Sequence, residues 1–139
     1  MRKVLLISVK PEYSQKIFTG EKKIELRKVK PSIKSGDIVV IYESSPTMAL
    51  KGSVIVDSVL SETPESIWNK YNHIAGISKD KYNEYYQNHN LAYGITFNKV
   101  TEYEYPLTLK TLRKLWDGFS PPQSYRYLTY DDTEKLVCL

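Results

Sequence analysis

The sequence has few of the residues that support redox or metal chemistry. Among its 139 residues there are one cysteine, Cys138, and two histidines, His73 and His89. A single cysteine excludes an internal disulfide, and these three residues do not match the spacing of known metal-ligand sets. We therefore expect no bound metal, no cofactor and no redox function.

Long apolar runs are also missing from the chain. The longest, such as "VLLISV" and "DIVVIY", are far below the roughly 20 residues that span a bilayer. The N-terminal residues do not show an apolar stretch followed by a small-residue cleavage site. We expect a soluble, cytoplasmic protein with no membrane partner. The length, with 41% hydrophobic residues, predicts one domain over residues 1–139.

The net charge of +4 is distributed unevenly along the chain. Residues 1–36 hold ten cationic and three acidic side chains, so this quarter carries +7 and the remainder −3. Such asymmetry suggests an anionic partner, with nucleic acid or a phosphorylated small molecule as the natural candidates. A merely solvated, lysine-rich surface explains the charge about as well. Charge alone does not separate the two interpretations.

Apolar patterning predicts five or six strands. They are expected within "KVLLISV", "KKIELRK", "DIVVIYES", "MALKGSVIVDSVLSE", "NLAYGITFNKVTEYEYP" and the end of "GFSPPQSYRYL". Gly52 predicts a bulge or bend in the fourth segment. In the fifth, alternation places Gly94 and other small residues on one side, where another group can approach closely.

Helix start and stop signals lie between the strands. "PEYSQKIFTG" has Pro11 at its first position and Gly20 just past its end, which predicts an early short helix. Thr63 and Ser78 are suitable caps for two further helices. The strands are not separated by enough crossover helices for a doubly wound sheet. The sequence therefore predicts an α+β fold, a small mixed β-barrel with an early helix and an inserted helical pair.

The segment "GEKKIELRK" places several charges in one predicted strand. Lys23, Glu25 and Arg27 share its polar face, and Lys22 stands at its entry. A carboxylate flanked by cations stays ionised, as do the cations. We expect Glu25 to read a base edge, and Arg27 and Lys22 to hold phosphate or a carbonyl oxygen. The alternative is an exposed strand face with weak ion pairs.

Other segments supply further candidates for a binding site. Lys10 precedes a helix N-terminus, where backbone N–H groups favour an anion. Tyr42, Ser44 and Ser45 end a buried strand in "YESSP", as a wall of the site or as an ordinary turn. Gln123 can reach a ligand from a proline-constrained tail, although docking of the tail alone also explains that segment.

Two features have structural explanations as strong as functional ones. Tyr82, Tyr85 and Tyr86 share a helix face, which is more typical of packing than of base stacking. His73 is a candidate general base, or a hydrogen-bonded structural group in a loop.

Several ordered segments together resemble the ASCH domain, a member of the PUA-like superfamily of small β-barrels. The motif G-x-K-x-x-E-x-R matches at Gly20, Lys22, Glu25 and Arg27, and "GDIVVIYESSP" and "KGSVIV" follow it. "HIAGISKDKYNEYY", "AYGI" and "PPQSYRYL" resemble an ASCH subgroup often described as predicted transcriptional regulators. The resemblance covers nearly the whole chain. It implies a PUA-like barrel with a cleft for RNA or a nucleotide near the motif.

One branch of ASCH proteins removes the acetyl group of N4-acetylcytidine, and its catalytic lysine would fall on Lys22. That branch has threonine in place of Glu25, and a glutamate of its helical insertion falls near Ala75, where "HIAG" has no carboxylate. A catalytic lysine needs a lowered pKa, whereas an ionised Glu25 raises it. The sequence therefore argues against carrying that activity over.

The leading hypothesis is a module that binds RNA or a modified nucleotide in a polar cleft at the barrel mouth. An alternative is an amidohydrolase acting on an acylated nucleoside such as N4-acetylcytidine, with Lys22 as catalytic group and Glu25 or His73 assisting. A third is a regulator that acts with a protein partner. No helix-turn-helix pattern supports independent reading of duplex DNA. The expected ligand-binding residues are Lys10, Lys22, Glu25, Arg27, Tyr42, Ser44, Ser45 and Gln123.

Overall fold

A single curled sheet organises the chain in the computed structural model, which describes residues 2–136 and thus leaves Cys138 outside the described residues. The strands are β1 (Val4–Val9), β2 (Ile24–Arg27), β3 (Ile38–Glu43), β4 (Ala49–Glu62), β5 (Ala92–Thr108) and β6 (Tyr125–Leu128). The helices are α1 (Pro11–Thr19), α2 (Pro64–Tyr71), the 3₁₀ turn η1 (Asn72–Ile74), α3 (Lys79–Tyr85), α4 (Leu109–Leu115) and α5 (Tyr130–Lys135).

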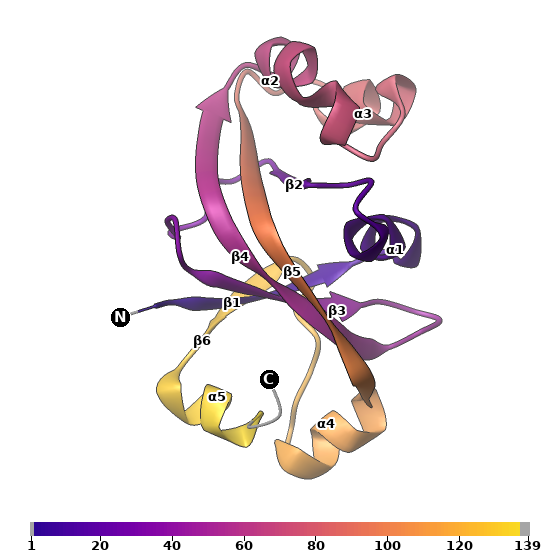
Figure 1. Cartoon of the computed structure of the whole chain (residues 1–139), viewed down its shortest axis with the longest axis vertical. Helices are drawn as coiled ribbons and strands as arrows, with labels where there is room; N and C mark the ends of the chain where they lie inside the picture. The colour runs from indigo at the N-terminus through magenta and orange to yellow at the C-terminus, as the bar shows by residue number, and fades with distance from the viewer. Residues whose placement is uncertain (1, 137–139) are drawn as a thin grey trace.

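The strand order of the sheet is β2-β5-β4-β3-β1-β6. β1 and β3 are parallel, and all other neighbours are antiparallel. The sheet curls into a half-barrel, with α2 and α3 at one end of the long strands β4 and β5 and with α4 and α5 at the other (Figure 1). The predicted α+β class, strand number, early helix and inserted helical pair are confirmed. Helix α5 was not predicted, although Thr129 and Asp132 form a capping box there.

Helix α1 forms where the sequence predicts it and packs against the sheet. Gly20 ends it with φ +89°, a left-handed conformation that suits glycine. Phe18 lies so close to Gly52 that a Cβ at residue 52 would be 2.6 Å from its ring and 2.2 Å from the Thr101 carbonyl oxygen. The pairing of β4 with β5 changes register beside Gly52, so the predicted bulge is confirmed. This close approach fixes α1 on one face of the half-barrel.

The helical pair, α2 and α3, covers one end of the half-barrel. The side chains of Thr63 and Ser78 accept hydrogen bonds from Ser66 N and Lys81 N at the starts of α2 and α3, as expected of N-caps. The pair packs on β2 and β5 through a cluster of buried residues: Ile24, Leu26, Ile67, Ala75, Tyr82, Tyr86 and Ala92. The group that approaches the small side of β5 is Ile24, whose Cδ1 would lie 2.7 Å from a Cβ at residue 94.

Two further clusters of buried hydrophobic residues fill the half-barrel and its end near α4 and α5. The first lies between α1 and the sheet and includes Leu5, Ile17 and Phe97. The second packs α4 and the end of α5 against β1 and β3, and Tyr42 belongs to it. No helix within residues 2–136 has the length and apolar character that crossing a bilayer requires.

We expect Gly52→Ala to lower the free energy of unfolding by about 1 to 3 kcal/mol, because the added methyl group has no room between Phe18 and β5. Chemical denaturation of wild type and variant measures the difference. Ser61→Ala, an exposed change on the same strand, is the control and should stay within about 0.5 kcal/mol of wild type. Equal stability of the two variants would contradict the packing described here.

Candidate functional site

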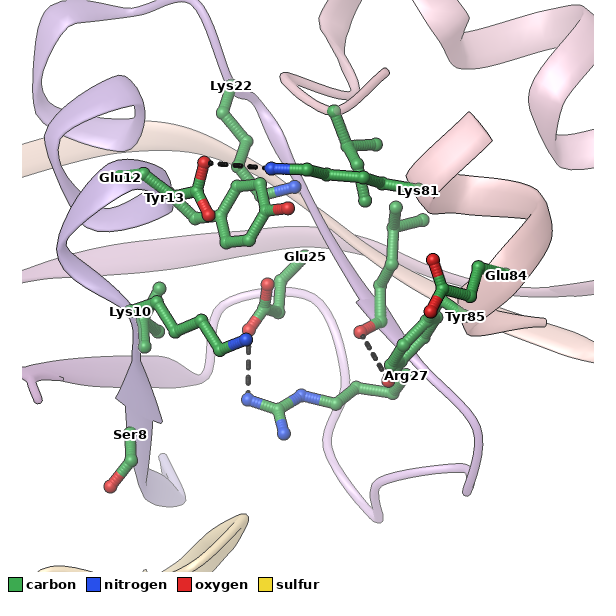
Figure 2. Close-up of a pocket in the computed structure, with 13 residues that line it drawn as sticks. Ser8, Lys10, Glu12, Tyr13, Lys22, Glu25, Arg27, Lys81, Glu84 and Tyr85 are labelled. Carbon is green, nitrogen blue, oxygen red and sulfur yellow. Dashed lines mark hydrogen bonds and ion pairs between the residues drawn. The ribbon is translucent and has the colours of Figure 1, made fainter. Parts of the chain in front are cut away.

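A pocket of about 520 Å³ opens between α1, β2 and α3, and we call it the first pocket. Figure 2 shows its labelled side chains arranged around a shared space, contributed by these three elements and the end of β1. It brings four cationic side chains together with three carboxylates and two tyrosine rings. These residues are Lys10, Lys22, Arg27 and Lys81; Glu12, Glu25 and Glu84; and Tyr13 and Tyr85.

Lys22 is buried at the back of the first pocket, with 3% of its surface exposed. Its Nζ donates a hydrogen bond of 2.6 Å to the Ala75 carbonyl oxygen and lies 5.4 Å from the centre of the Tyr13 ring. Burial lowers the pKa of Lys22, because desolvation disfavours the ammonium; Glu25 acts in the opposite direction with a smaller effect. Glu25 thus raises the pKa of Lys22 as the sequence predicts, but burial, which the sequence did not show, outweighs this effect and leaves the pKa lowered.

Glu25 and Arg27 form an ion pair on the pocket side of β2. Arg27 Nη2 donates to Glu25 Oε2 at 2.9 Å, and each side chain is 12% exposed. Arg27 Nη1 also donates to Ser124 Oγ at 3.0 Å. The second bond connects β2 with the segment just before β6. β2 and β6 are the two edge strands of the half-barrel. A shielded, charge-assisted pair of this kind is stronger than an exposed one.

The rim of the pocket joins α1 to α3. Lys81 Nζ lies 3.4 Å from Glu12 Oε2, a largely exposed pair that contributes little to stability. Tyr85 donates its hydroxyl hydrogen to the Leu26 carbonyl oxygen at 3.3 Å, and Lys28 Nζ lies 4.4 Å from the centre of the same ring. Burial raises the pKa of Tyr85. The rim therefore combines the largely exposed ammonium group of Lys81 with the ring of Tyr85, which a hydrogen bond holds in place.

The structure brings together four of the residues that the sequence singled out, Lys10, Lys22, Glu25 and Arg27. Lys23, which the strand pattern placed in the same row, is exposed and does not line the pocket. Lys22 is the buried lysine in place of Lys23, because the regular alternation of the strand begins only at Ile24.

The remaining candidates lie outside the first pocket. Tyr42 is 2% exposed and packs near Phe119, with ring centres 6.5 Å apart; burial raises its pKa. Ser44 is in the turn after β3, where its N–H donates to the Val9 carbonyl oxygen, and Ser45 is exposed beside it.

Two further candidates are exposed side chains. Gln123 adjoins Ser124, the partner of Arg27, but does not itself line the pocket. His73 lies on η1, also outside the pocket. The loop after His73 reaches the pocket through its backbone, because the carbonyl group of Ala75 accepts the Lys22 bond.

Among the charged and aromatic residues of the first pocket, sequence reasoning missed Glu12, Tyr13, Lys81, Glu84 and Tyr85. Lys81 and Tyr85 are four apart on α3 and share a helix face, and Tyr13 lies three residues after Lys10, the N-cap of α1. That spacing was a usable signal, but nothing in it shows which surface the face meets. Glu84 is a carboxylate from the helical pair, at a place other than the "HIAG" position considered above.

Within residues 2–136, no three His, Cys, Asp or Glu side chains gather in a way that could hold a metal ion. The pocket instead offers ammonium and guanidinium donors beside carboxylate acceptors and aromatic rings. Such a set suits a ligand with an anionic part, a hydrogen-bonding edge and a flat ring.

Comparison with known proteins identifies the family. The model of the ASCH domain matches residues 7–101, which include Lys10, Lys22, Glu25 and Arg27. The chain belongs to the ASCH domain family. The family match and the likeness to a solved ASCH structure confirm the PUA-like fold that the resemblance implied. The expected small barrel is present as a half-barrel.

Known proteins match this chain over most of its length. An ASCH domain-containing ribonuclease of Zymomonas mobilis is 27% identical over 138 residues, covering 99% of this chain and 93% of that protein. The crystal structure of ASCH from Zymomonas mobilis superposes with a TM-score of 0.93 at 27% identity, covering 100% of this chain and 96% of that one. The large ribosomal subunit protein uL22 of Ureaplasma parvum is 30% identical over 125 residues, which are 89% of this chain but 39% of that protein.

NMR titration of isotope-labelled lysine side chains tests the electrostatics of this ASCH domain. We expect Lys22, assigned by its loss in Lys22→Met, to titrate below 10.5, the ordinary pKa of lysine. Glu25→Gln should lower the pKa of Lys22 further, because it removes the negative charge that favours the ammonium. Lys16→Met should raise it, because Lys16 repels that ammonium. A Lys22 signal that titrates at or above 10.5 would rule out this description.

Proposed function

We propose that this protein binds RNA and holds one nucleotide of the strand in the first pocket. The observation that carries the proposal is the shielded Glu25–Arg27 pair at the side of a pocket of about 520 Å³. That volume lies in the usual range for small-ligand sites. A charged pair kept away from bulk water is costly unless a ligand or the fold uses it.

Each group in the pocket has a suitable counterpart in a nucleotide. Lys10 and the unused N–H donors of Arg27 can bind phosphate, and Lys22 can donate to a carbonyl oxygen of a base. Glu25 Oε1 can accept from the amino or imino edge of a base while Oε2 stays with Arg27. Tyr13 and Tyr85 offer rings on which an unstacked base can rest.

The comparisons support RNA as the ligand. The Zymomonas mobilis relative that covers nearly the whole chain is named a ribonuclease, and a ribonuclease must bind RNA. The excess of positive charge in residues 1–36 is consistent with a polyanionic partner. We propose a cytoplasmic location. A regulatory role with a protein partner is also consistent with a small RNA-binding module.

Cleavage of the bound RNA is a second candidate function, favoured by the buried amine of Lys22. Glu25 would take the proton of a 2′-hydroxyl, whose oxygen attacks the adjacent phosphorus. As the bond to the 5′-oxygen breaks, the Lys22 ammonium, made more acidic by burial, would protonate that oxygen. Arg27 would stabilise the charge on phosphorus. The products would be a 2′,3′-cyclic phosphate and a 5′-hydroxyl end.

Fluorescence anisotropy with a labelled single-stranded RNA tests the binding proposal. Arg27→Ala should weaken binding by about 1.5 to 3 kcal/mol and reduce the salt slope by about one. Glu25→Gln should change the preference among bases more than the overall affinity, because it acts on a base edge. Lys99→Ala also removes one cation, but from an exposed position of β5 outside the pocket, and serves as the control. Equal affinities for wild type, Arg27→Ala and Glu25→Gln would refute this placement of the site.

Incubation of the same RNA with the protein tests the second candidate. We expect cleavage to fall about 100-fold or more in Lys22→Met, because general acid catalysis contributes about 10² to 10⁴. A substrate with one deoxyribose should resist cleavage at that position. Parallel incubation with N4-acetylcytidine tests the amidohydrolase alternative, for which the lowered pKa of Lys22 removes one objection. Intact RNA together with release of acetate would favour that alternative instead.

A further inference from the structure

A second pocket, of about 450 Å³, lies at the opposite end of β1. Arg2, Lys3 and Val4 form one side of it, and Ser32, from the link between β2 and β3, forms another. The remaining side comes from the end of β6 and the start of α5: Tyr127, Leu128, Thr129, Tyr130 and Thr133. None of these residues takes part in the first pocket.

Exposed tyrosine rings concentrate at this second pocket. Among residues 2–136, Tyr105, Tyr127 and Tyr130 have 40% or more of their surface exposed, and two of the three line it. Tyr127 is held in place, because its hydroxyl oxygen accepts a hydrogen bond from Ser32 N at 2.5 Å. Lys3 Nζ lies 5.9 Å from the centre of the Tyr127 ring. A fixed ring and an exposed ring beside cations are the parts from which single-strand binding sites are built.

One strand connects the two pockets. β6 begins directly after Ser124, which holds Arg27 of the first pocket, and runs antiparallel to β1 until Leu128 reaches the second pocket. Tyr125 lies between them and makes an edge contact with Tyr127, with ring centres 5.8 Å apart. β6 therefore carries a pair of contacting rings between Ser124 and the second pocket.

Seven of the ten cations of residues 1–36 lie at the two pockets or between Arg27 and Ser32. Lys10, Lys22 and Arg27 line the first pocket, and Arg2 and Lys3 line the second. The link that leads from Arg27 to Ser32 carries two more exposed cations, Lys28 and Lys30. Part of the charge asymmetry seen in the sequence thus lies at the two pockets and in the link between β2 and β3. A chain of phosphates can use cations at both pockets, which a single nucleotide cannot.

The separation of the pockets sets the length of the ligand. The first pocket touches β1 at Ser8 and Val9, and the second touches Lys3 and Val4. Five residues of strand correspond to about 16 Å at about 3.3 Å per residue. At a rise of about 3.4 Å per stacked nucleotide, about five nucleotides cover that distance, and an unstacked, more extended strand covers it with fewer. A dinucleotide does not reach both pockets.

We infer that the second pocket is a further nucleotide subsite, so that the preferred ligand is a single strand of RNA longer than a dinucleotide, rather than a free nucleotide. This inference rests on the proposed function of the first pocket. In the second subsite a base stacks on Tyr130 beside Tyr127, and Arg2 with Lys3 binds the neighbouring phosphate.

The double variant Arg2→Ala with Tyr130→Ala tests the inference, because Tyr130 is 71% exposed and its loss leaves the core intact. Anisotropy is measured with a labelled octanucleotide of RNA and with a labelled dinucleotide. Affinity for the octanucleotide should fall about tenfold, from loss of one stacking contact and one cation. Affinity for the dinucleotide should stay unchanged. The matched control is Lys99→Ala with Tyr105→Ala, which removes one cation and one ring 80% exposed, both on β5 outside the two pockets.

The outcomes separate this inference from the proposed function. If the octanucleotide binds the double variant as tightly as wild type, while Arg27→Ala still weakens it, the second subsite is refuted and the first pocket stands. If octanucleotide and dinucleotide bind wild type equally well, the inference also fails. If neither RNA binds at low salt, the proposed function falls, and the inference falls with it.

Discussion

The segment of residues 74–76 is held against α1 and β2 by three hydrogen bonds, and the pocket depends on them. Lys23 N donates to the first carbonyl oxygen of this segment at 2.9 Å, Lys22 Nζ to the second at 2.6 Å, and Lys16 Nζ to the third at 3.1 Å. A buried ammonium is costly without such partners. Because all three acceptors precede α3, these bonds fix where that helix begins. They thereby bring Lys81 and Tyr85 to the pocket opposite α1.

The same arrangement determines the chemistry that the pocket can perform. Lys22 is held where burial lowers its pKa, while Glu25 and Arg27 remain a shielded ion pair in front of it. Arg27 also connects the two edges of the half-barrel through Ser124. Lys22 and Arg27 would thus bind the ligand and also stabilise the fold. Substitutions of these residues therefore need measurements of binding or titration in addition to stability.

Local sequence signals predicted most of the fold. Pro11 and Gly20 marked the ends of α1, and Thr63 and Ser78 marked the starts of the helical pair, because caps and turns act within a few residues. The bulge at residue 52 was also predicted, because glycine within a strand is typical of such positions. The reason for that glycine was not, because its neighbours Phe18 and Thr101 are distant in sequence.

The sequence by itself determined a curled α+β sheet and a motif whose charges lie close together, since Lys22, Glu25 and Arg27 share one short segment. It did not determine which side chains would be buried. Tyr42, at the end of β3, turned toward the second cluster, whereas Tyr85, expected only to pack, lines the first pocket. Only the tertiary structure decided these places and the pKa of Lys22. Desolvation depends on atoms from helices and strands far along the chain, and no local pattern records their approach.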